Sequence, residues 1–158
     1  MLITATVDQH RLAPVDRAAA FALLADVPRS VQHFPDVESV RPVGEVWQWR
    51  LRELGAGPLR FQVAYASRYL IDTTALRVAW ARVPGFGNTA VDGEWRLEPE
   101  PGGTRIRMVA RFEIDTPFPR LTRAAVEAVV AHENTRLIGA YIDNLVTTLR
   151  GGDGRARR

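Results

Sequence analysis

The acid best placed to do chemistry in this sequence is Glu133, which interrupts an otherwise mostly apolar stripe of the long C-terminal segment. At 100° per residue, seven other residues fall on the same line: Val126, Val130, Leu137, Ala140, Tyr141, Asn144 and Thr148. An unpaired buried carboxylate is costly, so Glu133 must find a partner or take up a proton. One interpretation is a salt bridge to Arg136 or to an arginine of the sheet. The other is a cavity acid that hydrogen-bonds a ligand, or acts as a general acid/base with Tyr65 or Tyr69.

Aromatic side chains are the second set that could contact a ligand, because they recur at alternate positions of the segments predicted to be strands. Such rings usually pack in a core, but the polar groups of Tyr and Trp need partners when buried and can orient a ligand. With the helical stripe they give the candidate ligand-binding residues: Trp49, Tyr65, Tyr69, Trp80, Trp95, Phe112, Glu133, Leu137 and Tyr141.

Phe86 is a further candidate, and it stands between two glycines in a turn at the expected mouth of the cavity. Successive antiparallel strands place alternate turns at the same end. The loops 55–58, 84–88 and 115–119 should therefore share one rim with the start of the long helix. Phe86 is interpreted either as a mobile aromatic lid on glycine hinges or as part of a plain turn that needs glycine for positive φ.

Other kinds of catalytic site find little support in the sequence. The three histidines, His10, His33 and His132, show no spacing that predicts a metal site, and cysteine is absent. No nucleophile motif is present, and the Gly-x-Gly around Phe86 joins two strands instead of opening a phosphate-binding helix. We therefore expect no metal and no cofactor.

The elements that must position these residues are mainly strands in which apolar and polar residues alternate. One face collects the aromatic and aliphatic residues and the other collects Arg and Glu, which is typical of an antiparallel sheet with one covered face. Seven strands are predicted, the last of them after the turn at 101–103, and the first six span residues 3–8, 37–42, 46–54, 59–70, 74–83 and 89–98.

Helices are predicted between the first two strands and at the end of the chain. Asp16 is a good N-cap for a helix over 17–25, and Pro28 suits the first turn of a second helix over 28–33. The long helix over 119–149 would span roughly 45 Å, enough to cross the sheet. We expect Gly151 and Gly152 to end it.

Chain length and charge limit the classes of protein to which this sequence can belong. The 158 residues fit one domain, 1–149, followed by a basic tail, 150–158, that we expect to be disordered. All 21 basic residues are arginine, and residues 1–149 hold 17 of them against 17 acids. A neutral body with a short basic tail argues against a nucleic-acid partner. No run of residues is apolar enough for stable membrane insertion, and a cytoplasmic protein is expected.

The order of the predicted elements resembles the helix-grip fold of the START-like superfamily (SRPBCC), which includes pollen-allergen-type proteins, polyketide cyclase/dehydrase-like proteins and the G subunit of carbon-monoxide dehydrogenase. Three segments carry the resemblance locally: residues 14–26, residues 34–40, and the predicted hairpin from Gly93 to Arg105. The resemblance implies an α+β fold in which a seven-stranded curved antiparallel sheet wraps around the C-terminal helix, with two short helices between strands one and two.

The resemblance also implies a deep apolar cavity for a lipid-like or aromatic small molecule, and it leaves three functions open. The first is binding or carrying such a molecule. The second is a cyclase or dehydratase without metal that uses Glu133 as acid/base. The third is an interaction or assembly module with a collapsed core, which a continuous pocket of roughly 300 Å³ or more would argue against. Enzymatic activity, the identity of the ligand and a homodimer are left open.

Overall fold

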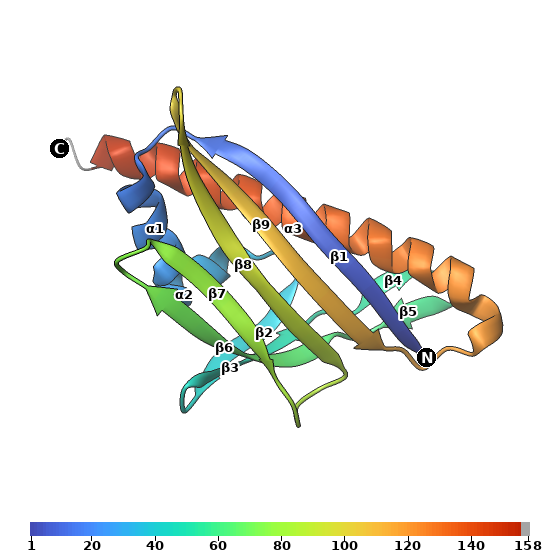
Figure 1. Ribbon diagram of the computed structural model, residues 1–158. Coiled ribbons are helices and arrows are strands. Elements are labelled where there is room, and N and C mark those ends of the chain that lie inside the picture. Colours follow the sequence, from blue (N-terminus) through green and yellow to red (C-terminus); the bar gives the residue numbers. More distant parts are fainter. Residues whose placement is uncertain (156–158) are drawn as a thin grey trace.

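A curved antiparallel sheet and one long helix make up most of the molecule (Figure 1). The computed structural model describes residues 1–155, the last four by their backbone alone. The strands are β1 (Leu2–Ala13), β2 (Val37–Val43), β3 (Val46–Leu51), β4 (Leu54–Ala56), β5 (Leu59–Phe61), β6 (Ala64–Asp72), β7 (Arg77–Val83), β8 (Thr89–Glu100) and β9 (Gly103–Asp115). The helices are α1 (Arg17–Ala25), α2 (Val27–Ser30), the short 3₁₀ turns η1 (Val31–His33) and η2 (Arg120–Thr122), and α3 (Arg123–Arg155).

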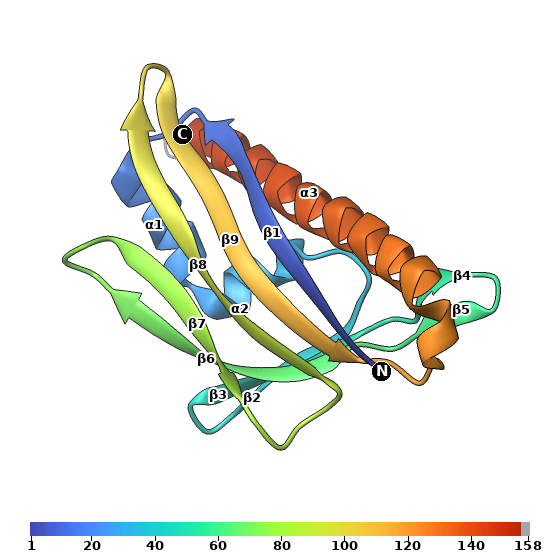
Figure 2. The same ribbon diagram turned by 45° about the vertical axis from the view of Figure 1, so that its right-hand side comes forward.

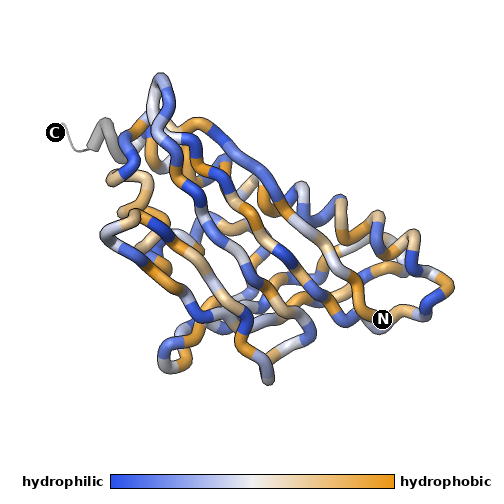
Figure 3. The backbone as a smooth tube through the Cα atoms, viewed as in Figure 1, coloured by the Kyte–Doolittle hydropathy of each residue, from blue (hydrophilic) through white to orange (hydrophobic). Residues whose placement is uncertain are grey.

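The main sheet has seven strands in the order β1-β9-β8-β7-β6-β3-β2. It is a meander from β2 to β9, with β1 added beside β9 so that Ile3 lies opposite Ile114. In Figure 1 the sheet bends around α3, and the predicted helix-grip architecture is confirmed. Tube colouring by hydropathy shows the predicted alternation of polar and apolar residues along the strands (Figure 3).

One difference from the predicted strands lies between β3 and β6. The expected strands over 46–54 and 59–70 are each interrupted, and a separate two-stranded hairpin, β4–β5, forms between them. Leu54 and Phe61 pair in this hairpin and are buried, and the hairpin lies beside the first turns of α3 (Figure 2). The main sheet does not cover the first turns of α3 in Figure 2. The interruption thus lets the hairpin bury two apolar residues, Leu54 and Phe61, at that end of the helix.

The short helices between β1 and β2 form as predicted. The Asp16 carboxylate accepts a hydrogen bond from the Ala19 backbone N–H at 2.8 Å, and Asp26 caps α2 in the same way. The 3₁₀ turn η1 then ends at Phe34, whose backbone is extended (φ −77°, ψ 125°) ahead of Pro35. These helices lie on the inner side of the sheet, beside the C-terminal half of α3 (Figure 2).

The long helix differs from the prediction at both ends. It begins at Arg123, after η2, and it passes through Gly151 and Gly152 to Arg155, so the expectation that these glycines end it is wrong. Glycine weakens a helix but keeps both backbone hydrogen-bonding groups, so it does not by itself stop one. Of the expected disordered tail, residues 156–158 lie outside the described residues.

The buried face of α3 is also rotated relative to the predicted stripe. Asn144 is exposed and Thr148 is partly exposed, and both instead meet His33. Asn144 Nδ2 donates to the His33 carbonyl oxygen at 2.9 Å, and Thr148 Oγ1 and His33 Nε2 share a hydrogen bond of 2.7 Å. The buried face consists of Val126, Val130, Leu137, Ile138, Tyr141, Ile142, Leu145, Val146 and Leu149.

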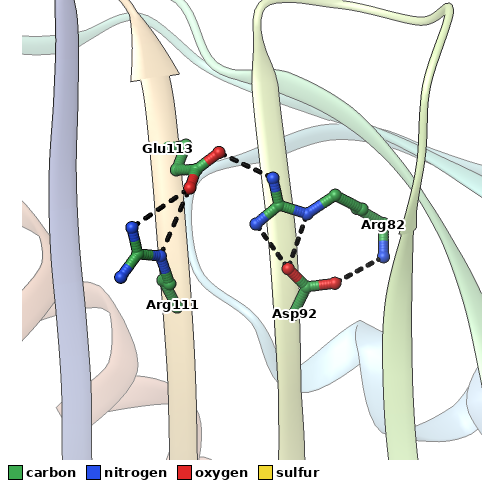
Figure 4. Close-up of polar contacts among 4 residues, drawn as sticks. All are labelled: Arg82, Asp92, Arg111 and Glu113. Carbon is green, nitrogen blue, oxygen red and sulfur yellow. Dashed lines mark hydrogen bonds and ion pairs between the residues drawn. The ribbon is translucent and has the colours of Figure 1, made fainter.

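Ion pairs cross the outer face of the sheet (Figure 4). The Arg82 guanidinium donates to Asp92 and to Glu113, each at 2.6 Å, and Arg111 also contacts Glu113 at 3.2 Å. Partial burial is the largest single influence on the pKa of Asp92 and raises it, but the hydrogen bonds from the Arg82 side chain and backbone, together with the nearby positive charges, lower the pKa overall. The Arg82 hydrogen bond also lowers the pKa of Glu113. This face is the solvated Arg–Glu surface expected from the alternation. Within the described part of the chain, no helix has the length and apolar character needed to cross a membrane.

Candidate functional site

Two small adjoining cavities lie between the inner face of the sheet and α3. The first, here called the aromatic chamber, has a volume of about 30 Å³ and is walled by seven of the predicted residues: Trp49, Tyr65, Tyr69, Trp80, Trp95, Phe112 and Tyr141. The second, the Glu133 chamber, has about 20 Å³ and is walled by Leu54, Phe61, Val130, Glu133 and Leu137, among others. The expected deep, continuous cavity is not formed among the described residues: the interior holds two chambers, each far below the roughly 300 Å³ typical of a small-molecule pocket. The pocket that would argue against a collapsed core is therefore missing from this structure.

Aromatic rings in contact form the wall of the aromatic chamber. Trp49 stacks on Tyr65 with ring centroids 5.5 Å apart and planes 11° apart, and Trp95 meets Tyr141 edge-on at 5.7 Å. The indole of Trp80 lies over the backbone of Gly93, where an added Cβ would come within 2.6 Å of the ring. A glycine at this inward position thus makes room for the indole, which sets the shape of the wall.

The polar groups of the aromatic chamber are all uncharged. Burial raises the pKa of Tyr141 to about 12, and the Ser30 hydroxyl, in a shared hydrogen bond of 2.8 Å, offsets part of the rise. Burial also raises the pKa of Tyr65 and, well above its usual value, that of Tyr69. The three phenols therefore remain protonated at physiological pH and can donate hydrogen bonds.

Two buried polar atoms of this chamber have no hydrogen-bond partner among the described residues. They are the indole Nε1 of Trp49 and the hydroxyl oxygen of Ser67. The Trp49 N–H offsets part of the pKa rise of Tyr69, but no hydrogen bond of normal geometry joins the two side chains. The chamber therefore combines an aromatic wall with a buried N–H and a buried hydroxyl that make no hydrogen bond of normal geometry with the described residues.

Glu133 lines the second chamber and is also part of an ion pair. Its side chain is 13% exposed, and Oε2 accepts a hydrogen bond from Arg136 Nη2 at 2.6 Å. The same guanidinium nitrogen donates to Asp36 Oδ2 at 2.9 Å, so Arg136 ties the segment after η1 to α3. Both carboxylates raise the pKa of Arg136, the Glu133 hydrogen bond most. This geometry matches the salt-bridge interpretation, and a role of Glu133 toward a ligand stays a prediction.

The partition between the two chambers is built from side chains that line both of them: Phe34, Tyr65, Phe112 and Ile138. Three of these four belong to strands or to α3, whereas Phe34 lies on the connection between η1 and β2. Its ring packs against the rings of Trp49 and Tyr141, with centroids 5.6 Å and 5.0 Å apart, respectively. Phe34 is therefore the part of the partition that can move with the least disturbance of regular structure.

Of the three loops expected to share the rim, 84–88 and 115–119 meet there, whereas 55–58 forms the turn of the β4–β5 hairpin. Asn88 Nδ2 donates to the backbone oxygens of Gln62 and Asp115, and Phe118 packs edge-on against Phe61 at 6.4 Å. An open hollow of about 390 Å³ lies at this rim. Phe61 lines both this hollow and the Glu133 chamber, so its side chain separates the interior from the outside at this point.

Phe86 lies outside the linings of both chambers. Its ring sits under the Arg50 guanidinium, 4.9 Å from the ring centroid to Cζ, which is the geometry of a cation–π contact. Gly85 and Gly87 both have positive φ (100° and 72°), as the plain-turn interpretation requires. An added Cβ at Gly87 would also lie 2.0 Å from the Ala64 carbonyl oxygen, so this glycine serves close packing.

Some residues of the site are absent from the sequence-based prediction. Ser67 lies two residues after Tyr65 on β6, and the alternation alone could have placed it on the inner face. Phe34 directly follows the predicted helix over 28–33, and no local pattern shows that its ring reaches the interior. Ile138 was missed because it lies 100° from Leu137 on an ideal helix, whereas the buried face of α3 includes both.

Comparisons with known proteins agree with this architecture. The family described as polyketide cyclase / dehydrase and lipid transport matches residues 4–150. A search of curated proteins finds no match.

Three solved structures illustrate the similarity of fold. Protein TTHA0849 of Thermus thermophilus is 21% identical, with a TM-score of 0.65, and the match covers 91% of this chain and 99% of that one. The Zhui aromatase/cyclase of Streptomyces sp. R1128 is 18% identical, with a TM-score of 0.63 and 94% of each chain covered. A Thalictrum flavum norcoclaurine synthase mutant, in complex with a transition-state analogue, is 11% identical, with a TM-score of 0.66 and coverage of 97% and 98%. At these identities the similarity concerns the fold.

Proposed function

Because the chain belongs to the family described as polyketide cyclase / dehydrase and lipid transport, we propose that it binds an uncharged, largely aromatic small molecule between its sheet and α3. The observation that carries this proposal is the aromatic chamber, whose described lining residues are all uncharged. An apolar ligand gains from leaving water, whereas a charged group would find no countercharge there.

Binding requires the two chambers to join, because neither holds more than one or two water-sized molecules as they stand. Displacement of the Phe34 ring would remove part of the partition and extend the aromatic chamber toward the rim. The Asp36–Arg136–Glu133 ion pairs hold the segment that carries Phe34 on α3 and would oppose this movement. We therefore expect ligand binding to be coupled to a shift of this segment.

A fluorescence titration with N-phenylnaphthylamine, an uncharged apolar probe, tests the proposal. Val91 is buried and lines the aromatic chamber, so Val91→Phe should fill it and weaken probe binding at least tenfold. Val109→Phe adds the same bulk on the outer face of the next strand and should leave binding unchanged. Circular dichroism checks that both variants fold. Equal binding by the two variants, or no binding by the wild type, would overturn the proposal and favour an interaction module.

Native mass spectrometry of protein purified from its own host addresses the natural ligand. We expect a complex with one small molecule whose mass is released on denaturation. Protein that binds N-phenylnaphthylamine but carries no copurified molecule would still fit a carrier that was isolated empty.

A cyclase or dehydratase activity is the second candidate, and the position of Glu133 in a chamber wall favours it. As the anionic member of an ion pair, Glu133 would act as a base that removes a proton next to a carbonyl group of the ligand. Once a substrate has been found, Glu133→Gln tests this role. Unchanged turnover would exclude the base, and a loss of binding alone would fit a carrier.

A further inference from the structure

We infer that Trp49 and Ser67 form a polar anchor that recognises a neutral oxygen acceptor of the ligand, such as a ketone, quinone or ester carbonyl. The inference rests on the proposed function and makes it more specific, because it names the group that the aromatic chamber selects.

The first support is the burial of two polar groups that the protein leaves unpaired. Trp49 is 2% exposed and Ser67 is 1% exposed, and neither the indole Nε1 nor the serine oxygen makes a hydrogen bond of normal geometry with the described residues, although the Trp49 N–H lies near the Tyr69 hydroxyl. Folded proteins rarely leave a buried polar group without a partner, because its lost hydration is not replaced. An indole N–H can only donate, so the group that completes this site must be an acceptor.

The second support is that the two residues line the same chamber from adjacent strands. Trp49 lies opposite Tyr65 in the β3–β6 ladder and Trp47 lies opposite Ser67, so Trp49 and Ser67 are diagonal neighbours on the inner face. Both line the aromatic chamber. A carbonyl oxygen has two lone pairs and can accept from the indole and the hydroxyl at once.

The third support is the electrostatic character of the chamber. The described lining carries no charged side chain, and burial keeps the phenols of Tyr65, Tyr69 and Tyr141 protonated. A carboxylate or phosphate would therefore lie buried without a countercharge, at a cost that two neutral donors do not offset. The chemistry selects an uncharged acceptor, and the stacked rings of Trp49 and Tyr65 select a flat one.

Fluorescence of PRODAN, a naphthalene that carries a propionyl carbonyl and a dimethylamino group, tests the anchor directly. Its emission moves to longer wavelength when the carbonyl accepts a hydrogen bond. Dimethylaminonaphthalene, which has the same ring system without the carbonyl, is the matched probe. Ser67→Ala removes one donor, and Ser39→Ala, on β2 and outside both chamber linings, is the matched control variant.

We expect Ser67→Ala to weaken PRODAN binding about tenfold, the loss of one buried hydrogen bond, and to move its emission to shorter wavelength. Binding of dimethylaminonaphthalene should not change, and Ser39→Ala should bind both probes as the wild type does. Replacement of Trp49 by benzothienylalanine, which keeps the ring shape but puts sulfur in place of the N–H, should have the same selective effect.

The outcomes separate this inference from the proposed function. If the wild type binds both probes but neither substitution distinguishes them, the anchor is refuted. If neither probe binds the wild type, the proposed function fails and the anchor fails with it.

Discussion

Replacing Phe34 with alanine should join the two interior chambers into one. The removed ring occupies roughly 100 Å³, and at about 24 cal/mol per Å³ the residual cavity contributes about 2.4 kcal/mol to the loss of stability. Phe34 is partly exposed, so this value lies below the 3–5 kcal/mol usual for a fully buried phenylalanine. Urea denaturation measures the loss directly.

The same substitution should strengthen binding of an apolar probe. In the wild type, part of the binding energy must displace the Phe34 ring, whereas Phe34→Ala holds the space open in advance. A gain of about tenfold in affinity for N-phenylnaphthylamine corresponds to about 1.4 kcal/mol, roughly half of the lost packing energy. Saturating probe should also raise the denaturation midpoint of the variant more than that of the wild type.

Phe118→Ala serves as the matched control, because Phe118 is a partly buried phenylalanine that lines neither chamber. It should lose stability without gaining affinity. If Phe34→Ala binds the probe no better than Phe118→Ala does, Phe34 is not the partition and the coupling of binding to its displacement is wrong.

Three further predictions concern the frame around the site. Gly93→Ala should cost about 1–3 kcal/mol, because the new methyl group overlaps the Trp80 ring, and a loss below 0.5 kcal/mol in urea denaturation would contradict the packing. Stability should fall between pH 10 and 12, because over this range Tyr141 ionises in the unfolded chain but stays protonated in the folded protein. The fall attributable to this residue is up to about 2.7 kcal/mol. Tyr141→Phe should flatten that fall, and an unchanged pH profile would count against the burial. At acid pH, Arg82 lowers the pKa of Asp92, so stability is lost as the pH drops below the ordinary carboxyl range. Arg82→Ala should make that loss of stability with pH shallower. An equally steep loss in the variant would show that the Arg82–Asp92 pair contributes nothing.

The strand order and the aromatic lining could be predicted because both follow from local patterns. Alternation places Trp49, Tyr65 and Trp95 on one face whatever the sheet packs against, and Asp16 and Asp26 cap helices through contacts within three residues. The resemblance to the helix-grip fold added the wrapping of the sheet around the long helix, and the structure confirms it.

The division of the interior could not be predicted, because it depends on side chains that meet only in the folded protein. Phe34 reaches Tyr141, more than a hundred residues away, through the path of the chain after η1. The pairing of Glu133 with Arg136 was one of two interpretations that the helix pattern left open, and Asp36 as a second partner is a tertiary contact. Phe86 was expected at the mouth because alternate turns of the sheet share one end, and its loop does reach the rim, but its ring lies against Arg50 and lines neither chamber.

Methyl NMR during titration with N-phenylnaphthylamine tests most directly whether the interior is the binding site. Val91, Met108 and Ile138 line the aromatic chamber, whereas Leu70 and Leu121 are exposed on the surface. Saturable shifts confined to the three interior methyl groups, at one probe per protein, are the predicted result. Shifts at Leu70 or Leu121 with the interior signals unmoved would contradict the account.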